Sequence, residues 1–147
     1  MNCVFCAIAD GQLPAHVVHE DEHFLVLLDI FPLRPAHVLI VARGHAPLLA
    51  DLPAAPREAL LALAERVGRA LQRSDPSVLG INLLLNDGPV ANQHVPHLHL
   101  HLIPRRVGDL PALCWRILTR FLPLGRRRLE ARLAGEAERL RAALAEG

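Results

Sequence analysis

The sequence predicts an α+β domain built on an antiparallel sheet of about five strands, with one helix packed on the sheet and further helices at the C-terminal end. Short apolar runs rich in Val, Ile and Leu are joined by turn residues, and one longer segment spaces its apolar residues as a helix does. Hairpins outnumber strand–helix–strand units, which favours antiparallel pairing. The 147 residues fit one domain and are too few for two ordinary ones.

Five segments have the composition of strands. Asp21 and Glu22 separate the first two, which predicts a hairpin, and two prolines in the segment 31–35 predict a loop after the second. Residues 86–89, Asn-Asp-Gly-Pro, close the fourth strand with a strong turn signal. The predicted strands are Val17–Glu20, Phe24–Leu28, His37–Val41, Gly80–Leu85 and Leu98–Ile103.

Helical spacing is clearest after Pro56, a residue that suits a first helical turn. A helix to about Arg73 would place one apolar stripe on the core, namely Leu60, Leu63, Ala64, Val67, Ala70 and Leu71. Residues 112–122 and 125–146 predict two further helices, and residues 3–10 a short helical turn that Gly11 ends. The sequence shows no internal repeat and no low-complexity linker.

Charge divides the chain into two parts that we expect to fold as one domain. Residues 1–104 carry an excess of acidic groups, whereas residues 105–147 carry ten Arg against five acids. We therefore expect a main unit over 1–104 and an Arg-rich helical extension over 105–147 packed on it. The basic extension either favours anionic partners or is a solvated helix face in a chain that has no lysine.

Composition also bounds the compartment. With 52% hydrophobic residues the chain can bury a core, but no uncharged stretch reaches the roughly 18 residues that a membrane span needs. Met1-Asn2-Cys3-Val4 does not begin a signal peptide, because no basic stretch precedes an apolar block. Three cysteines, an odd number, argue against a disulfide framework. We expect a cytoplasmic protein without membrane contact.

Histidines cluster at the last predicted strand. Four of the nine lie between His94 and His101. Because side chains alternate along a strand, His97, His99 and His101 share one face, with successive Cα atoms about 6.6–7 Å apart, and the intervening leucines face the core. Such a row indicates metal binding or acid–base and nucleophilic chemistry. The alternative is a row of partly exposed histidines on a solvent face.

The cysteines give a second signal. Cys3 and Cys6 have the C-x₂-C spacing of a zinc turn, which needs two further ligands. The alternative is a pair of reduced cysteines near a flexible terminus. Cys114 is expected to be a small buried apolar residue.

Residues 97–103, His-Leu-His-Leu-His-Leu-Ile, match in full the motif of the histidine triad (HIT) family of nucleotide hydrolases and transferases, and the chain resembles that family. Residues 86–88, Asn-Asp-Gly, resemble the family's Asn-x-Gly loop, and Gln93 its Gln before the triad. The order Asp29, Ile30, Pro32, His37 resembles its ribose-binding segment, and Cys3-x-x-Cys6 its bacterial-type N-terminus. The resemblance covers about residues 2–104.

The resemblance implies a role for each matched residue. His99 would be the nucleophile that forms a nucleotidyl-histidine intermediate, with His101 and His37 binding phosphate oxygens. Asp29 would accept from the ribose hydroxyls and Asn86 would add a polar contact. The remaining nucleotide-binding residues would be Gln93, His94 and an apolar wall around the base, Val4, Phe5, Ile8, Leu27 and Ile30. For the wall and for His37, ordinary core packing is the alternative.

The resemblance also completes a structural Cys₂His₂ zinc site, with His45 and His97 joining Cys3 and Cys6. Two positions depart from the family pattern: Asn92 stands where Gly is usual, and His94 where Ser or Thr is usual. Asn tolerates positive φ, so the loop keeps its shape. His94 would act as a donor or general acid near the leaving group, replace His97 on zinc, or turn outward.

The expected function is release of a nucleoside monophosphate, AMP in the first place, from a phosphoramidate, an adenylate or a dinucleoside polyphosphate. The alternative is a zinc-stabilised nucleotide-binding or interaction protein with little turnover. The resemblance implies a purine nucleotide as ligand and a homodimer, and the 56–73 helix favours the dimer because it has more apolar residues than one face needs. Nucleic-acid binding is not expected, since the Arg-rich tail lacks an aromatic platform.

Overall fold

The computed structural model describes residues 3–123 and 125–147. Met1 and Asn2, the first residues of the predicted 1–104 unit and of the segment that argued against a signal peptide, lie outside the described residues. The strands are β1 (Val17–Glu20), β2 (Phe24–Leu28), β3 (Val38–Ala42), β4 (Gly80–Leu85) and β5 (His99–Arg105). The helices are α1 (Val4–Ala9), α2 (Ala54–Ser74), α3 (Leu110–Thr119) and α4 (Arg126–Ala145), with two short 3-10 turns, Leu49–Asp51 and Pro89–Ala91.

The described residues form one antiparallel sheet of five strands in the order β1-β2-β3-β5-β4. The predicted α+β fold class is therefore confirmed. The β3–β5 pairing fixes the register of the histidine strand β5, with His99 opposite Val41 and His101 opposite Leu39. The pairing makes the histidine strand β5 an inner strand of the sheet, between β3 and the edge strand β4.

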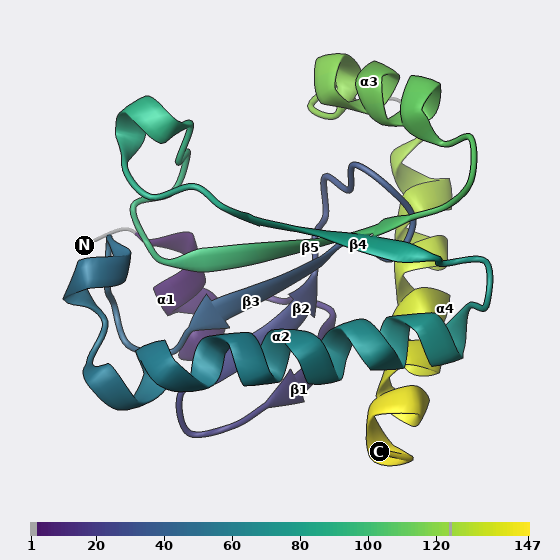
Figure 1. Cartoon of the computed structure of the whole chain (residues 1–147). Coiled ribbons are helices and arrows are strands. Elements are labelled where there is room, and N and C mark those ends of the chain that lie inside the picture. Colours follow the sequence, from purple (N-terminus) through teal and green to yellow (C-terminus); the bar gives the residue numbers. More distant parts are fainter. Residues whose placement is uncertain (1–2, 124) are drawn as a thin grey trace.

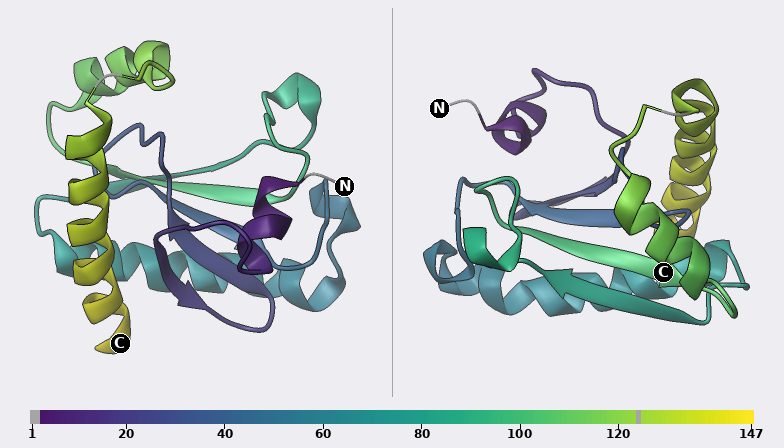
Figure 2. Two further views of the ribbon diagram at one scale, coloured as in Figure 1. Left: turned by 180° about the vertical axis from the view of Figure 1, so that it is seen from behind. Right: turned by 90° about the horizontal axis from the view of Figure 1, so that it is seen from above.

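Both faces of the sheet are covered, by different helices (Figures 1 and 2). Seen from above, the sheet lies between α1 on one side and α2 on the other. The α2 face holds the larger core, which includes Leu98, Leu100 and Leu102. The α1 face holds a smaller core of Cys3, Phe5, Leu25, Leu27, Leu39 and Val41. The histidines alternate with the three core leucines, so they lie on the α1 face, as the alternation predicted.

The C-terminal helix α4 belongs to the same core as the sheet. It packs against α2 and β1 and buries Leu133, Ala137 and Leu140 almost completely. Arg73 of α2 donates to the carbonyl oxygen of Ala143 at 2.8 Å, which ties the ends of the two helices together. Burial of apolar side chains at about 25 cal/mol per Å² supplies most of the docking energy.

Asp109 fastens the chain between β5 and α3. Its carboxylate accepts from Arg105 at 2.6 Å and lies 3.2 Å from Nε of Arg34. The Arg105 guanidinium, together with the backbone N–H of Arg106, lowers the pKa of Asp109 to about 2 despite its burial. The start of α3 is therefore attached to both the triad strand and the loop after β2.

The segment boundaries differ from the predicted ones mainly around β5 and α3. The triad strand begins at His99 instead of Leu98 and continues to Arg105. The helix predicted over 112–122 spans Leu110–Thr119, and its Cys114 is exposed, so the expectation of a buried cysteine was wrong. None of the helices in the described part of the chain combines the length and the apolar character that crossing a membrane requires.

Candidate functional site

His99 is held in one tautomer by its own strand. Its Nδ1–H donates to the carbonyl oxygen of His97 at 2.7 Å, so Nε2 carries the lone pair. Burial lowers the pKa of His99 below its usual value. The ring rests against Phe5 of α1, with ring centroids 5.0 Å apart. The result is a neutral imidazole with an unprotonated nitrogen at the wall of the main cavity.

His101 and His37 form a hydrogen-bonded pair behind His99. The backbone N–H of Leu33 donates to Nδ1 of His37 at 3.0 Å, so Nε2 of His37 carries the proton and donates to Nδ1 of His101, also at 3.0 Å. His101 therefore presents Nε2–H to the cavity that it lines. Burial lowers the pKa of His37 to about 4 and that of His101 to about 3, so both rings are neutral near pH 7.

This arrangement places His37 differently from the expectation. His37 was expected to bind phosphate oxygens, but it is 1% exposed, does not line the cavity and uses both ring nitrogens within the protein. It lies where it can orient His101, and not where it can touch a ligand. The partner that sets this role is the backbone N–H of Leu33, which no sequence motif reveals.

The main cavity is about 760 Å³, within the roughly 300–1,000 Å³ typical of small-ligand sites. The structure brings most of the predicted ligand-binding residues together around it. Those that line it are Val4, Phe5, Ile8, Leu27, Asp29, Ile30, Asn86, His94, His99 and His101.

Gln93 is the other predicted ligand-binding residue that lies outside this cavity. Its side-chain oxygen accepts from the backbone N–H of Gly88 at 2.9 Å, and its side-chain amide donates to the carbonyl oxygen of Pro47 at 2.7 Å. Both polar ends of the Gln93 amide are therefore used inside the protein, where they hold the β4–β5 loop against the segment after β3. Gln93 was expected to contact the nucleotide, and the structure gives it a loop-fastening position instead.

Asp29 is buried at the end of β2, and its two carboxylate oxygens have different partners. Oδ1 accepts from the backbone N–H of Phe31 at 2.8 Å, and Oδ2 accepts from the guanidinium of Arg120 at 3.0 Å. Arg120 follows α3, so the C-terminal extension reaches the cavity. Ile117 and Phe121 line it as well. Sequence reasoning missed these three residues; the only signal was the Arg-rich character of the tail.

His94 is exposed on the loop between β4 and β5 and lines the cavity, with its ring centroid 6.0 Å from that of Phe121. Asn92, two residues before it, has φ of +65°, in the left-handed region that Asn tolerates, as the departure from Gly required. Of the three roles left open for His94, replacement of His97 in the cysteine cluster is excluded, because the ring that meets the cysteines is that of His97.

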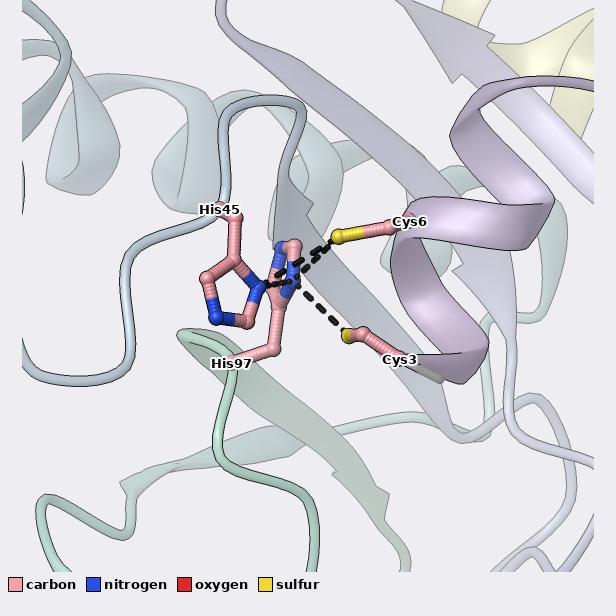
Figure 3. A group of neighbouring side chains, drawn as sticks. All are labelled: Cys3, Cys6, His45 and His97. Atoms are coloured by element: carbon pink, nitrogen blue, oxygen red, sulfur yellow. Dashed lines mark hydrogen bonds between the residues drawn. The ribbon is translucent and has the colours of Figure 1, made fainter. Parts of the chain in front are cut away.

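Cys3, Cys6, His45 and His97 gather at one end of α1 and point toward one another (Figure 3). Nδ1 of His97 lies 3.3 Å from Sγ of Cys3, 3.6 Å from Sγ of Cys6 and 3.3 Å from Nδ1 of His45. A tetrahedral zinc ion with bonds of about 2.0–2.3 Å separates neighbouring ligand atoms by roughly 3.3–3.8 Å. The spacing of these four donors therefore suits zinc.

The outer contacts of His97 suit a metal as well. Its Nε2–H donates to the carbonyl oxygen of Ala42 at 2.6 Å, which leaves Nδ1 unprotonated and directed at the cysteines. A backbone carbonyl in this position is the usual way in which a protein orients a metal-binding imidazole. The donor set, two thiols and two imidazoles, is that of a closed structural site.

Comparison with known proteins agrees with this geometry. The family model described as the HIT domain matches residues 10–108. An uncharacterized HIT-like protein of Mycobacterium tuberculosis is 38% identical over 109 residues, which cover 74% of this chain and 75% of that protein. The adenylylsulfatase HINT3 of Arabidopsis thaliana is 35% identical over 108 residues, 74% of this chain and 54% of that protein.

Among solved structures, a zinc-bound histidine triad family protein from Mycobacterium smegmatis matches with a TM-score of 0.82 and 38% identity. The match covers 99% of this chain and 95% of that one, so it includes the C-terminal helices that the family model does not reach. The histidine strand, the fold and these matches together show that the chain belongs to the HIT family.

Proposed function

We propose that the chain is a nucleotide hydrolase or nucleotidyl transferase that releases a nucleoside monophosphate, AMP in the first place, through a nucleotidyl-histidine on His99. One observation carries the proposal. The hydrogen bond from Nδ1 of His99 to the carbonyl oxygen of His97 leaves Nε2 unprotonated at a cavity of nucleotide size. An imidazole nitrogen with a free lone pair is a competent nucleophile toward phosphorus.

The reaction would proceed in two displacements. Nε2 of His99 attacks the α-phosphorus, a nitrogen–phosphorus bond forms, and the bond from phosphorus to the leaving group breaks with its electron pair. Water then attacks the same phosphorus and displaces His99, releasing the monophosphate and a proton. His101, whose Nε2–H is fixed by His37, would donate to the phosphate oxygens as charge develops on them.

Binding would come from the rest of the cavity. Asp29 would accept from the ribose hydroxyls and Asn86 would add a polar contact. The wall of Val4, Phe5, Ile8, Leu27 and Ile30 would hold the base by apolar burial. The relative named adenylylsulfatase supports an adenylyl-bearing substrate. The leaving groups that this chemistry admits are those of phosphoramidates, adenylates and dinucleoside polyphosphates.

The four donors Cys3, Cys6, His45 and His97 would hold a structural Zn²⁺, as their spacing suits. The zinc-bound relative from Mycobacterium smegmatis supports this assignment. The ion would join α1, whose Phe5 packs on His99, to His97, which lies two residues before the start of β5. It supplies rigidity to this end of the cavity and takes no part in the displacements.

Rapid quench into alkaline denaturant, in which a nitrogen–phosphorus bond to histidine survives, with an adenosine phosphoramidate labelled in its phosphate tests the function. We expect a burst of label on the wild-type protein, localised to His99 by peptide mapping, and no labelled protein from His99→Ala. His23→Ala, at the surface beside Glu22, is the matched control and should give the wild-type burst. A wild-type protein that binds AMP without forming labelled protein or turning over would be a nucleotide-binding protein and would refute the proposal.

A further inference from the structure

A second cavity, of about 220 Å³, adjoins the main cavity, which is called the nucleotide cavity from here on. Five arginines line the second cavity, called the arginine cavity. They come from three places in the chain: the loop after β2, the region of α3, and α4. The five are Arg34, Arg116, Arg120, Arg126 and Arg132. Among the described residues that line this cavity there is no carboxylate.

Carboxylates around this cavity compensate only part of the positive charge. Arg34 pairs with Asp109, Arg120 with Asp29, and Arg132 with Glu136. All three carboxylates have further partners: Asp109 also binds Arg105, Glu136 accepts from the backbone N–H of Ala36, and Asp29 accepts from the backbone N–H of Phe31.

Two arginines lack a carboxylate partner among the described residues. Arg116 donates to the carbonyl oxygen of Pro32 at 3.1 Å, and the guanidinium of Arg126 lies 5.2 Å from the centre of the Phe31 ring. Burial and the neighbouring Arg132 and Arg120 lower the pKa of Arg116. No carboxylate among the described residues neutralises Arg116 or Arg126, so the cavity keeps an excess of positive charge. A cavity with such an excess favours the binding of an anion.

The two cavities share three lining residues, Phe31, Leu33 and Arg120. Arg120 is the link, because its guanidinium donates to Asp29 in the nucleotide cavity while it lines the arginine cavity. Its Nε is buried without a hydrogen-bond partner among the described residues. A ligand in the nucleotide cavity that reaches Asp29 can therefore place a substituent beside Arg120 and the arginine cavity.

The size and chemistry select the substituent. A volume of 220 Å³ is below the roughly 300–1,000 Å³ of drug-sized sites, so it suits one anionic group and not a second nucleoside. Planar guanidinium groups match phosphate oxygens bidentately. We propose that this arginine cavity binds a second phosphate group, carried on the 2′ or 3′ oxygen of the ribose of the nucleotide that the HIT site takes.

The position on the ribose follows from Asp29, and the inference rests on the proposed function at this step. In AMP both ribose hydroxyls are free to donate to Asp29; in a ribose bisphosphate Asp29 would keep one of them, and the phosphorylated oxygen beside it would face Arg120, which donates to Asp29, and the arginine cavity. A phosphate there would meet Arg120, Arg116 and Arg126, and Arg120 would separate it from the Asp29 carboxylate. The 5′ phosphate would meanwhile remain at His99.

Calorimetric titration of the full-length protein with four nucleotides tests this. They are AMP, adenosine 2′,5′-bisphosphate, adenosine 3′,5′-bisphosphate and ADP. We expect one of the two ribose bisphosphates to bind at least tenfold more tightly than AMP, and ADP to show no such gain. Arg126→Gln and Arg116→Gln should each remove most of the gain and leave AMP affinity within about twofold, since charge-assisted hydrogen bonds are lost only to the second phosphate.

Arg127→Gln is the matched control, because Arg127 is exposed on the same helix and does not line the cavity. It should retain the full gain. Equal affinities for AMP and both bisphosphates, a gain that survives in both cavity variants, or an equal gain with ADP would each overturn the inference and leave the proposed function intact. Failure of AMP itself to bind would contradict the proposed function.

Discussion

The carbonyl oxygen of His97 accepts from Nδ1 of His99 at 2.7 Å, while the imidazole of His97 meets the two cysteines at 3.3 and 3.6 Å. One residue thus belongs to the candidate metal centre through its side chain and to the candidate nucleophile through its backbone. A single hydrogen bond therefore separates the residue that meets the cysteines from His99. The candidate metal centre and the candidate nucleophile are therefore adjacent in the structure, joined through His97.

We predict about one zinc ion per chain in metal-replete protein and its loss in Cys6→Ser. The melting temperature of this variant should fall by roughly 10 °C, since each kcal/mol moves Tm by about 2–4 °C in a chain of this size. The kcat of the protein that stays folded at low temperature should fall less. Elemental analysis and calorimetry measure both, and Cys114→Ser, at an exposed cysteine outside the cluster, should match wild type. Metal-replete wild-type protein without zinc would contradict the assignment.

The sequence predicted the strands best where turn residues bound them. Val17–Glu20, Phe24–Leu28 and Gly80–Leu85 have the predicted bounds, because Asp21-Glu22 and Asn86-Asp87-Gly88 end the apolar runs sharply. Alternation also placed the triad histidines on one face. These are properties of local sequence, with periods of two residues and turns of two to four.

The roles of His37 and Gln93 were not predictable in the same way. Their partners are backbone groups, the N–H of Leu33 and the carbonyl of Pro47, which carry no sequence signature. The contribution of Arg120 was hidden for a related reason. Helical spacing over residues 112–122 predicts a helix but not where it docks, so the pairing of Arg120 with Asp29 is evident only in the tertiary structure.

His37→Ala should lower kcat by roughly 10- to 100-fold with little change in KM, the usual cost of losing an orienting partner. Without His37 the Nδ1 of His101 loses its donor, and Nε2–H is no longer fixed toward the ligand. Nitrogen-15 NMR of His101 separates this role from simple destabilisation. The spectrum should show an unprotonated Nδ1 of His101 in the wild type and a mixture of the two neutral tautomers of His101 in the variant. A single unchanged tautomer of His101 in the variant would exclude the orienting role.

Asp109→Asn should lower the free energy of unfolding by about 2 kcal/mol at pH 7, as expected for a carboxyl whose pKa falls from 3.8 to about 2 on folding. The unfolded chain binds the proton more tightly, so this stability is complete above about pH 5 and is lost as pH falls through about 4 toward 2. Urea unfolding from pH 7 to pH 3 should therefore show wild type and variant converging in acid. Glu58→Gln, at an exposed helix position, should show no such difference. A pH-independent gap would refute the Arg105–Asp109 origin.

The protein should be a homodimer with β4 and α2 at the interface. β4 is an edge strand, and Leu83 on it and Leu61 on α2 are 51% and 66% exposed. An apolar edge strand of this kind is usually covered by a partner. Light scattering should give twice the 16.1 kDa of one chain. Leu61→Glu should shift the mass toward one chain, whereas Leu118→Glu, at an exposed leucine of α3, should not. A wild-type mass of one chain would contradict the dimer.

His94→Ser should change leaving-group preference more than it changes the rate of nucleotidyl-His99 formation from an activated substrate. His94 is exposed at the cavity, on the loop that Asn92 shapes, and it lies outside the cysteine cluster. A donor at this position helps most when the leaving group is basic and needs a proton as it departs. Turnover of phosphoramidates should therefore fall by roughly tenfold or more, while substrates with good leaving groups should change by less than about twofold.

Zinc content and melting temperature provide the second readout for the His94→Ser variant, and both should stay at wild-type values because His97 supplies the ring nitrogen that meets the cysteines. His23→Ser makes the same chemical change at a distant surface histidine and should alter neither preference nor stability. Steady-state kinetics across a phosphoramidate, an aminoacyl-adenylate and a dinucleoside polyphosphate measure the preference. Equal rate changes for all three substrates would leave His94 as a surface residue, because a proton donor must distinguish leaving groups by their basicity.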